Sequence, residues 1–149
     1  MKTMETGRTT GAYRLYPERT HQLVEPPFPS LCAHRGLSKA CPENTLPAFA
    51  AAIACGAHEF DLWPSRDGVP VVCHDSSVDR TTNGKGNIAE LDWDDIRRLD
   101  AGIRFGTVWE SVRIPCLDEF FERSDGLVGL NIHIQGIGPD GNTIKRKMP

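Results

Sequence analysis

The feature that most limits the fold of this chain is the alternation of short apolar runs with a helical repeat. Leu31–His34 and His58–Leu62 have the extended, apolar character of strands, and the first is expected to be fully buried up to its last residue. Between them, apolar residues recur at helical spacing over 46–54, with a helix cap predicted at Asn44 or Thr45. A strand followed by a helix and a further strand favours a parallel sheet.

The next part of the chain continues this pattern. The turn Arg66-Asp67-Gly68 joins the strand over 58–62 to the extended run Val69–Cys73, which predicts a hairpin. A short helix is predicted over about 92–99, and a further helix over Leu117–Arg123.

A last strand is predicted over Leu127–Ile134. Side chains two positions apart on a strand share a face, so Asn131, His133 and Gln135 would lie on one face. The isoleucines between them would lie on the other face.

Composition and length indicate one soluble globular domain, with 149 residues, a net charge of −3 and 39% hydrophobic residues. Residues 1–30 are polar and then proline-rich, which predicts a flexible N-terminal arm before one domain over 31–149. Balanced charges argue against a nucleic-acid partner, and no apolar run approaches the roughly 20 residues of a transmembrane segment. The start lacks the apolar core of a secretory signal, so the chain is expected in the cytoplasm, with its five cysteines as reduced, packed thiols.

Glu59 and Asp61 are the strongest candidates for a metal site. They lie two apart in an extended segment, so both carboxylates would point to one place. Carboxylate oxygens favour Mg²⁺ or Ca²⁺, with Mn²⁺ as an alternative. The competing interpretation is a pair of solvent-facing acids on an edge strand.

Two histidines lie near the ends of separate apolar stretches. His34 is followed by Arg35 and Gly36, and His74 by Asp75. Each imidazole could move protons around a substrate, and the guanidinium fork of Arg35 matches phosphate oxygens. The alternatives are structural histidines and a surface arginine.

The ordered set of these motifs resembles the glycerophosphodiester phosphodiesterase family. It comprises His34-Arg35-Gly36, Pro42-Glu43-Asn44-Thr45, Glu59-Phe60-Asp61, the run Asp67–Asp75 and an Arg-Thr-Thr loop, over about Leu31 to Gln135. The resemblance implies an α/β fold of the TIM-barrel type, with the site at the C-terminal ends of the strands. Only three barrel strands and the hairpin can be placed, so the chain is expected to be the leading part of a truncated barrel.

The resemblance also implies roles at matching positions. His34 and His74 would serve as acid and base, while Arg35 would contact phosphate. Supporting hydrogen bonds would come from Glu43, Asn44 and Asp75. The reaction would be metal-dependent hydrolysis of a small-molecule glycerophosphodiester to glycerol 3-phosphate and an alcohol. The identity of the alcohol, and attack by the glycerol hydroxyl or by water, remain open alternatives.

One departure from the family lies on the last strand. Where the family usually carries Glu-x-Lys, this chain has His133-Ile134-Gln135. His133 could still be the third metal ligand, but an imidazole removes a negative charge and shifts preference toward softer transition metals. Affinity for Mg²⁺ or Ca²⁺ should therefore fall. Gln135 also lacks the positive charge that a lysine would offer a phosphate.

Two other functions compete with the enzyme. The first is a truncated, weakly active or inactive relative that binds phosphate or forms a homo-oligomer, because an open sheet leaves an edge and an apolar face uncovered. The second is a phospholipase D-type hydrolase that acts on lipid headgroups.

Overall fold

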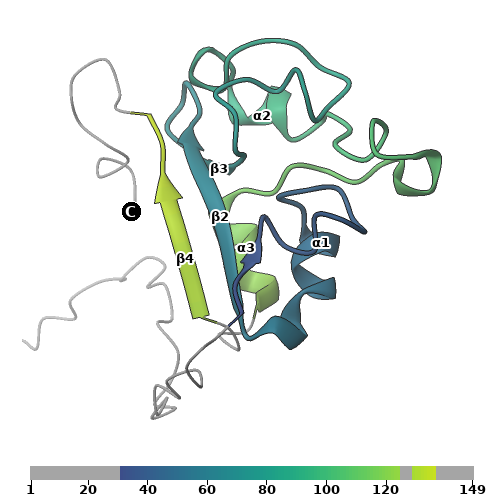
Figure 1. Cartoon of the computed structure of the whole chain (residues 1–149). Coiled ribbons are helices and arrows are strands. Elements are labelled where there is room, and N and C mark those ends of the chain that lie inside the picture. Colours follow the sequence, from purple (N-terminus) through teal and green to yellow (C-terminus); the bar gives the residue numbers. More distant parts are fainter. Residues whose placement is uncertain (1–30, 125–128, 137–149) are drawn as a thin grey trace, which may run out of the picture.

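The computed structural model describes residues 31–124 and 129–136, and shows a small sheet with two helices, over 46–51 and 117–124, packed on one face (Figure 1). The predicted arm over 1–30 lies outside the described residues. The strands are β1 (Ala33–His34), β2 (Ala57–Pro64), β3 (Pro70–Val72) and β4 (Gly129–Ile134). The helices are α1 (Leu46–Ala51), α2 (Trp93–Ile96) and α3 (Leu117–Ser124), with 3-10 turns at Ile53–Cys55, Ile88–Glu90 and Thr107–Trp109.

Strand β2 is the centre of the sheet. β1 pairs with it in parallel and β3 pairs with it antiparallel, while β4 pairs with it in parallel from Ala57↔Gly129 to Leu62↔Ile134. Figure 1 shows β4 alongside β2, with β1 and β3 on the opposite edge. The parallel sheet and the hairpin predicted from the sequence are both confirmed.

The two faces of the sheet contact different cores. Phe60 and Leu62 of β2 pack with Phe49 and Phe120 from α1 and α3, and the Phe60 and Phe120 ring centroids lie 4.7 Å apart. On β3, Val72 belongs to this core, while the preceding valine belongs to a second core under the loops between β3 and α3. Because successive residues on a strand face opposite ways, Glu59 and Asp61 lie on the face of β2 opposite α1 and α3.

Of the two residues predicted to cap α1, Asn44 and Thr45, the structure confirms Thr45 in position but shows no side-chain cap hydrogen bond. Thr45 occupies the cap position with extended backbone angles, but its hydroxyl donates to the Pro42 carbonyl oxygen at 2.6 Å. Asn44 has a positive φ of 55° and its side chain forms no cap hydrogen bond. Pro47 lies in the first turn, where a missing N–H costs nothing.

Other expectations were wrong in detail. The predicted buried strand over Leu31–His34 shrinks to Ala33–His34, and Leu31 is 73% exposed, because β1 meets β2 only at the register of those two residues. Helix α2 ends at Ile96, earlier than predicted, because the backbone N–H groups of Arg98 and Leu99 donate to carbonyl oxygens three residues back and continue the chain as a turn.

The cysteines are free, as expected, although only three of the five are buried and Cys32 is exposed. Among the helices of residues 31–124 and 129–136, none has the length and apolar character needed to cross a membrane.

Candidate functional site

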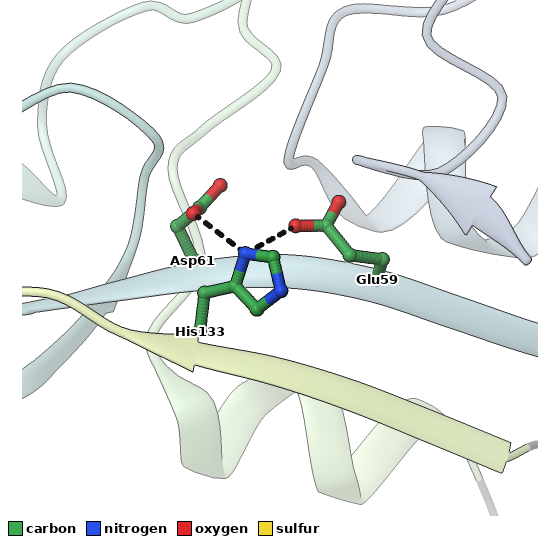
Figure 2. Close-up of side chains that lie close together, drawn as sticks. All are labelled: Glu59, Asp61 and His133. Atoms are coloured by element: carbon green, nitrogen blue, oxygen red, sulfur yellow. Dashed lines mark ion pairs between the residues drawn. The ribbon is translucent and has the colours of Figure 1, made fainter.

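Glu59 and Asp61 meet His133 at the surface of the sheet (Figure 2). The register between β2 and β4 pairs Asp61 with His133, which places the imidazole beside both acids. His133 Nδ1 lies 3.3 Å from Glu59 Oε1 and 3.6 Å from Asp61 Oδ1. One donor atom from each of the three residues falls within 4.8 Å of the others, a spacing that suits one metal ion.

Each carboxylate accepts a hydrogen bond through one oxygen, while its other oxygen has no hydrogen-bond partner. Glu59 Oε2 accepts the Arg35 backbone N–H at 3.0 Å, and Asp61 Oδ1 accepts the Gln135 side-chain amide at 3.2 Å. Glu59 Oε1 and Asp61 Oδ2 are buried without a hydrogen-bond partner, and the side chains are only 6% and 2% exposed. Buried carboxylate oxygens without partners are costly, so the residues present fit a bound cation.

The segment after β1 brings His34 to the same place. His34 Nε2 lies 3.7 Å from Glu59 Oε2, and its side chain is 65% exposed. The chain then turns through two residues of positive φ, Arg35 at 57° and Gly36 at 73°. A Cβ on Gly36 would lie 2.7 Å from the Ala48 carbonyl carbon, so only glycine lets this turn pack on α1. The structure thus places His34 on the same rim as the acid pair, as the sequence predicts.

A chain of ion pairs joins Arg35 to His74. Arg35 pairs with Glu43 at 3.2 Å, and Arg80 donates to Glu43 at 2.7 and 3.0 Å. Arg80 also donates to Asp75 at 2.6 and 3.1 Å, and Asp75 Oδ1 lies 2.7 Å from His74 Nδ1. Arg80 was missed as a functional residue, although its Arg-Thr-Thr loop carries the signal.

The arginines of this ion-pair network keep Asp75 and Glu43 ionised. The hydrogen bond from Arg80 lowers the pKa of Asp75 to about 2, despite partial burial. Burial raises the pKa of Glu43, but the hydrogen bonds and charges of Arg80 and Arg35 outweigh it and leave that pKa below its usual value. As an anion, Asp75 can only accept, so His74 Nδ1 carries the proton and Nε2 is left for chemistry.

The supporting role predicted for Asn44 stays a prediction, because its side chain forms no hydrogen bond to the residues that the structure describes. Its side chain is 4% exposed, and both amide atoms are buried without a hydrogen-bond partner. Its backbone N–H instead donates to the Arg35 carbonyl oxygen at 3.1 Å, which ties the two turns together. No pattern in the sequence indicates this backbone contact.

Comparisons with known proteins agree with the motifs. The profile of the glycerophosphoryl diester phosphodiesterase family matches residues 34–147. A glycerophosphodiester phosphodiesterase from Caldanaerobacter subterraneus is 48% identical over 105 residues, which are 67% of this chain and 43% of that protein. Glycerophosphodiester phosphodiesterase 1 from Bos taurus is 45% identical over 60% of this chain and 28% of its own. The chain therefore spans less than half the length of these relatives.

Solved structures agree in fold. A glycerophosphodiester phosphodiesterase from Agrobacterium tumefaciens matches with a TM-score of 0.67 and 37% identity, over 70% of this chain and 46% of its own. A phosphodiesterase from Oleispira antarctica, in complex with the product sn-glycerol-3-phosphate, matches with a TM-score of 0.67 and 37% identity, over 72% and 44%. The described strands and helices are thus the leading part of an α/β fold of the TIM-barrel type.

Proposed function

This chain belongs to the glycerophosphoryl diester phosphodiesterase family, and we propose that its site hydrolyses a glycerophosphodiester to glycerol 3-phosphate and an alcohol. The observation that carries the proposal is a pair of buried oxygens without a hydrogen-bond partner, Glu59 Oε1 and Asp61 Oδ2. The two acids that carry them lie close to His133, and Glu59 also lies close to His34. The product complex of the Oleispira relative supports the choice of substrate class.

Glu59, Asp61 and His133 would hold a divalent cation, for which family resemblance suggests Mg²⁺ or Ca²⁺, with Mn²⁺ as the alternative. Such an ion would neutralise the phosphodiester and stabilise charge that builds on its oxygens. The Arg35 backbone N–H and the Gln135 amide hold the two carboxylates in place for this task.

Arg35 would contact the phosphate. Its Nη1 already donates to Glu43, but its Nε is buried without a hydrogen-bond partner. A phosphate oxygen would satisfy that donor, and the fixed guanidinium would orient the substrate.

His34 and His74 would transfer the protons. Asp75 accepts from His74 Nδ1, so the Nε2 atom of His74 can take or give a proton, and His34 stands beside Glu59 with most of its ring exposed. One imidazole would accept the proton of the attacking hydroxyl while the other donates to the leaving alcohol. Attack by the glycerol hydroxyl and attack by water both require these two transfers.

The test is hydrolysis of glycerophosphocholine by the purified chain, with and without a chelator. We expect activity that stops with the chelator and returns with added cation, and a fall of about 100-fold or more in Glu59→Gln. Glu110→Gln, an exposed acid outside the site, is the matched control and should keep full activity. Hydrolysis that survives both the chelator and Glu59→Gln would disprove a cation-dependent site.

A second function, self-association, is favoured by one observation. Strand β4 pairs with β2 on one side, and its residues Leu130 and Ile134 are 37% and 57% exposed. Exposed apolar side chains on a sheet edge are common sites of pairing between chains. The chain would then associate through β4 with a second copy.

Light scattering tests this second function. We expect the wild-type chain to form assemblies larger than a monomer, and Ile134→Lys to reduce their size. Val108→Lys, at a position that is 85% exposed on a 3-10 turn, is the control and should leave the size unchanged. A monodisperse wild-type monomer with strong hydrogen-exchange protection across Gly129–Ile134 would rule it out.

A further inference from the structure

We propose that the cation site of this chain selects a first-row transition-metal dication, for which Mn²⁺ is the probe, over Mg²⁺ and Ca²⁺. The inference rests on the proposed function only in placing a cation at Glu59, Asp61 and His133. It concerns which ion these three side chains favour.

The donor set contains a nitrogen. Glu59 and Asp61 each offer one unpaired oxygen, Oε1 and Oδ2, and His133 offers Nδ1. Mg²⁺ and Ca²⁺ are hard ions that take oxygen ligands, whereas imidazole nitrogen suits transition metals. A site in which one of three protein donors is an imidazole therefore loses more affinity for Mg²⁺ and Ca²⁺ than for Mn²⁺.

The pairing of β2 with β4 directs the Nδ1 atom of His133 toward the two carboxylates. His133 Nδ1 faces both carboxylates, at 3.3 Å from Glu59 Oε1 and 3.6 Å from Asp61 Oδ1 (Figure 2). This direction follows from the parallel register that sets Asp61 opposite His133 on neighbouring strands. The imidazole is thus placed to ligate without a rearrangement of the sheet.

Charge favours the same choice. The two carboxylates give the site two negative charges, and a ligating histidine is neutral, so the site has less charge than three carboxylates would give. The remaining carboxylate oxygens are occupied, since Glu59 Oε2 accepts the Arg35 N–H and Asp61 Oδ1 accepts Gln135. The three side chains therefore offer a hard cation few oxygen ligands in exchange for its bound water. A transition metal also gains a bond to the imidazole nitrogen.

Mn²⁺ is a better probe than Zn²⁺ for this chain. The sequence has five cysteines, all free, and Cys32 is exposed. Thiolates bind zinc strongly and would compete with the site, whereas Mn²⁺ favours carboxylate oxygens over thiolates. Its electron paramagnetic resonance signal also distinguishes bound from free ion without any substrate.

The experiment is titration of the whole purified chain with Mn²⁺, followed by competition with Mg²⁺ and with Ca²⁺. We expect Mn²⁺ to bind at least about tenfold more tightly than either competitor, and its spin echo to show modulation from a nitrogen ligand. His133→Glu should reduce the preference for Mn²⁺ over Mg²⁺ and Ca²⁺ by about tenfold, because a third carboxylate replaces the imidazole. The variant should also lose the nitrogen modulation. Glu110→Gln, at an exposed acid outside the site, is the control and should bind these ions as wild type does.

Each outcome decides the matter. Equal binding of Mn²⁺ and Mg²⁺ by the wild-type chain, absence of nitrogen modulation, or no Mn²⁺ binding would overturn the inference, and none of these results depends on whether the variant folds. Tight Mn²⁺ binding without hydrolysis of glycerophosphocholine would uphold the inference and count against the proposed function. Hydrolysis of glycerophosphocholine by a chain that binds Mg²⁺ as tightly as Mn²⁺ would uphold the proposed function and overturn the inference.

Discussion

Arg35 is the residue at which the two halves of the site meet. Its backbone N–H donates to both the carbonyl oxygen and the side chain of Glu59, while its guanidinium pairs with Glu43. It does so with a φ of 57°, a left-handed conformation that costs a non-glycine residue about 1–2 kcal/mol. Such strain persists where surrounding contacts fix it, and it often marks a functional site.

The histidines give the first residue-scale expectation. His34→Ala and His74→Ala should each lower the rate of glycerophosphodiester hydrolysis by roughly 100-fold or more, the usual contribution of a positioned acid or base. Folding should survive, since the side chain of His34 is 65% exposed and that of His74 is 40% exposed, so neither fills the core. His21→Ala, which removes an imidazole outside all the motifs, is the control. Near-full activity in both variants would mean that these histidines are structural.

The second residue-scale expectation concerns Asp75 and the pH dependence of folding stability. Its pKa is about 2 in the folded chain against an ordinary 3.8, so its ion pair with Arg80 stabilises the fold above the ordinary pKa and ceases to do so as pH falls through about 2. Asp75→Asn should therefore cost about 1 kcal/mol of unfolding free energy near neutral pH, a value reduced for solvent screening. The difference in unfolding free energy between wild type and Asp75→Asn should become smaller toward acid pH.

Urea unfolding at a series of pH values measures that gap. Glu110→Gln, at an exposed acid away from the ion pairs, should show no such narrowing. A gap between wild type and Asp75→Asn that stays constant from neutral to acid pH would show that the ion pair contributes nothing to stability.

At the scale of elements, strand β2 carries both the core and the site. Phe60 and Leu62 face the helices, while the alternate positions, Glu59 and Asp61, face the site. This division follows from the period of two along a strand, so the sequence alone could predict it. The order of strands and helices was predictable for the same reason, because it depends on local apolar patterns.

Contacts between distant segments were not predictable in this way. Arg80 reaches Glu43 across 37 residues, and Asn44 holds its amide unpaired because a left-handed turn ties its backbone to Arg35. These depend on how loops fold over one another. The pairing of Asp61 with His133 depends on the register of β4, which no single strand encodes.

The turn at Gly36 gives an element-scale expectation. Gly36→Ala should destabilise the fold by about 3 kcal/mol, because it adds a left-handed backbone penalty and a clash at 2.7 Å with Ala48. Gly56→Ala is the matched control, with a φ of 82° but no atom within 4 Å of the new Cβ, and should cost only about 1 kcal/mol. Equal losses in urea unfolding would show that Gly36 does not pack against α1 as described.

At the scale of the whole molecule, the site lies on a sheet in which β4 pairs on one edge only, among the residues that the structure describes. The chain spans 43% to 46% of the Caldanaerobacter relative and of the Agrobacterium structure, and strand β4 leaves Leu130 and Ile134 partly exposed. The carboxylates are nevertheless buried and the ion pairs to His74 are formed within the described residues. The side chains proposed for catalysis are therefore held by this part of the barrel.

The most direct test of the central claim is identification of the products from glycerophosphocholine by mass spectrometry. The purified chain is incubated with Mn²⁺, Mg²⁺ or Ca²⁺ in turn, beside Asp61→Asn. We expect equal amounts of glycerol 3-phosphate and choline from the wild-type chain, and neither product from the variant. Release of glycerol and phosphocholine, or no product with any cation, would contradict the assignment of this site to glycerophosphodiester hydrolysis.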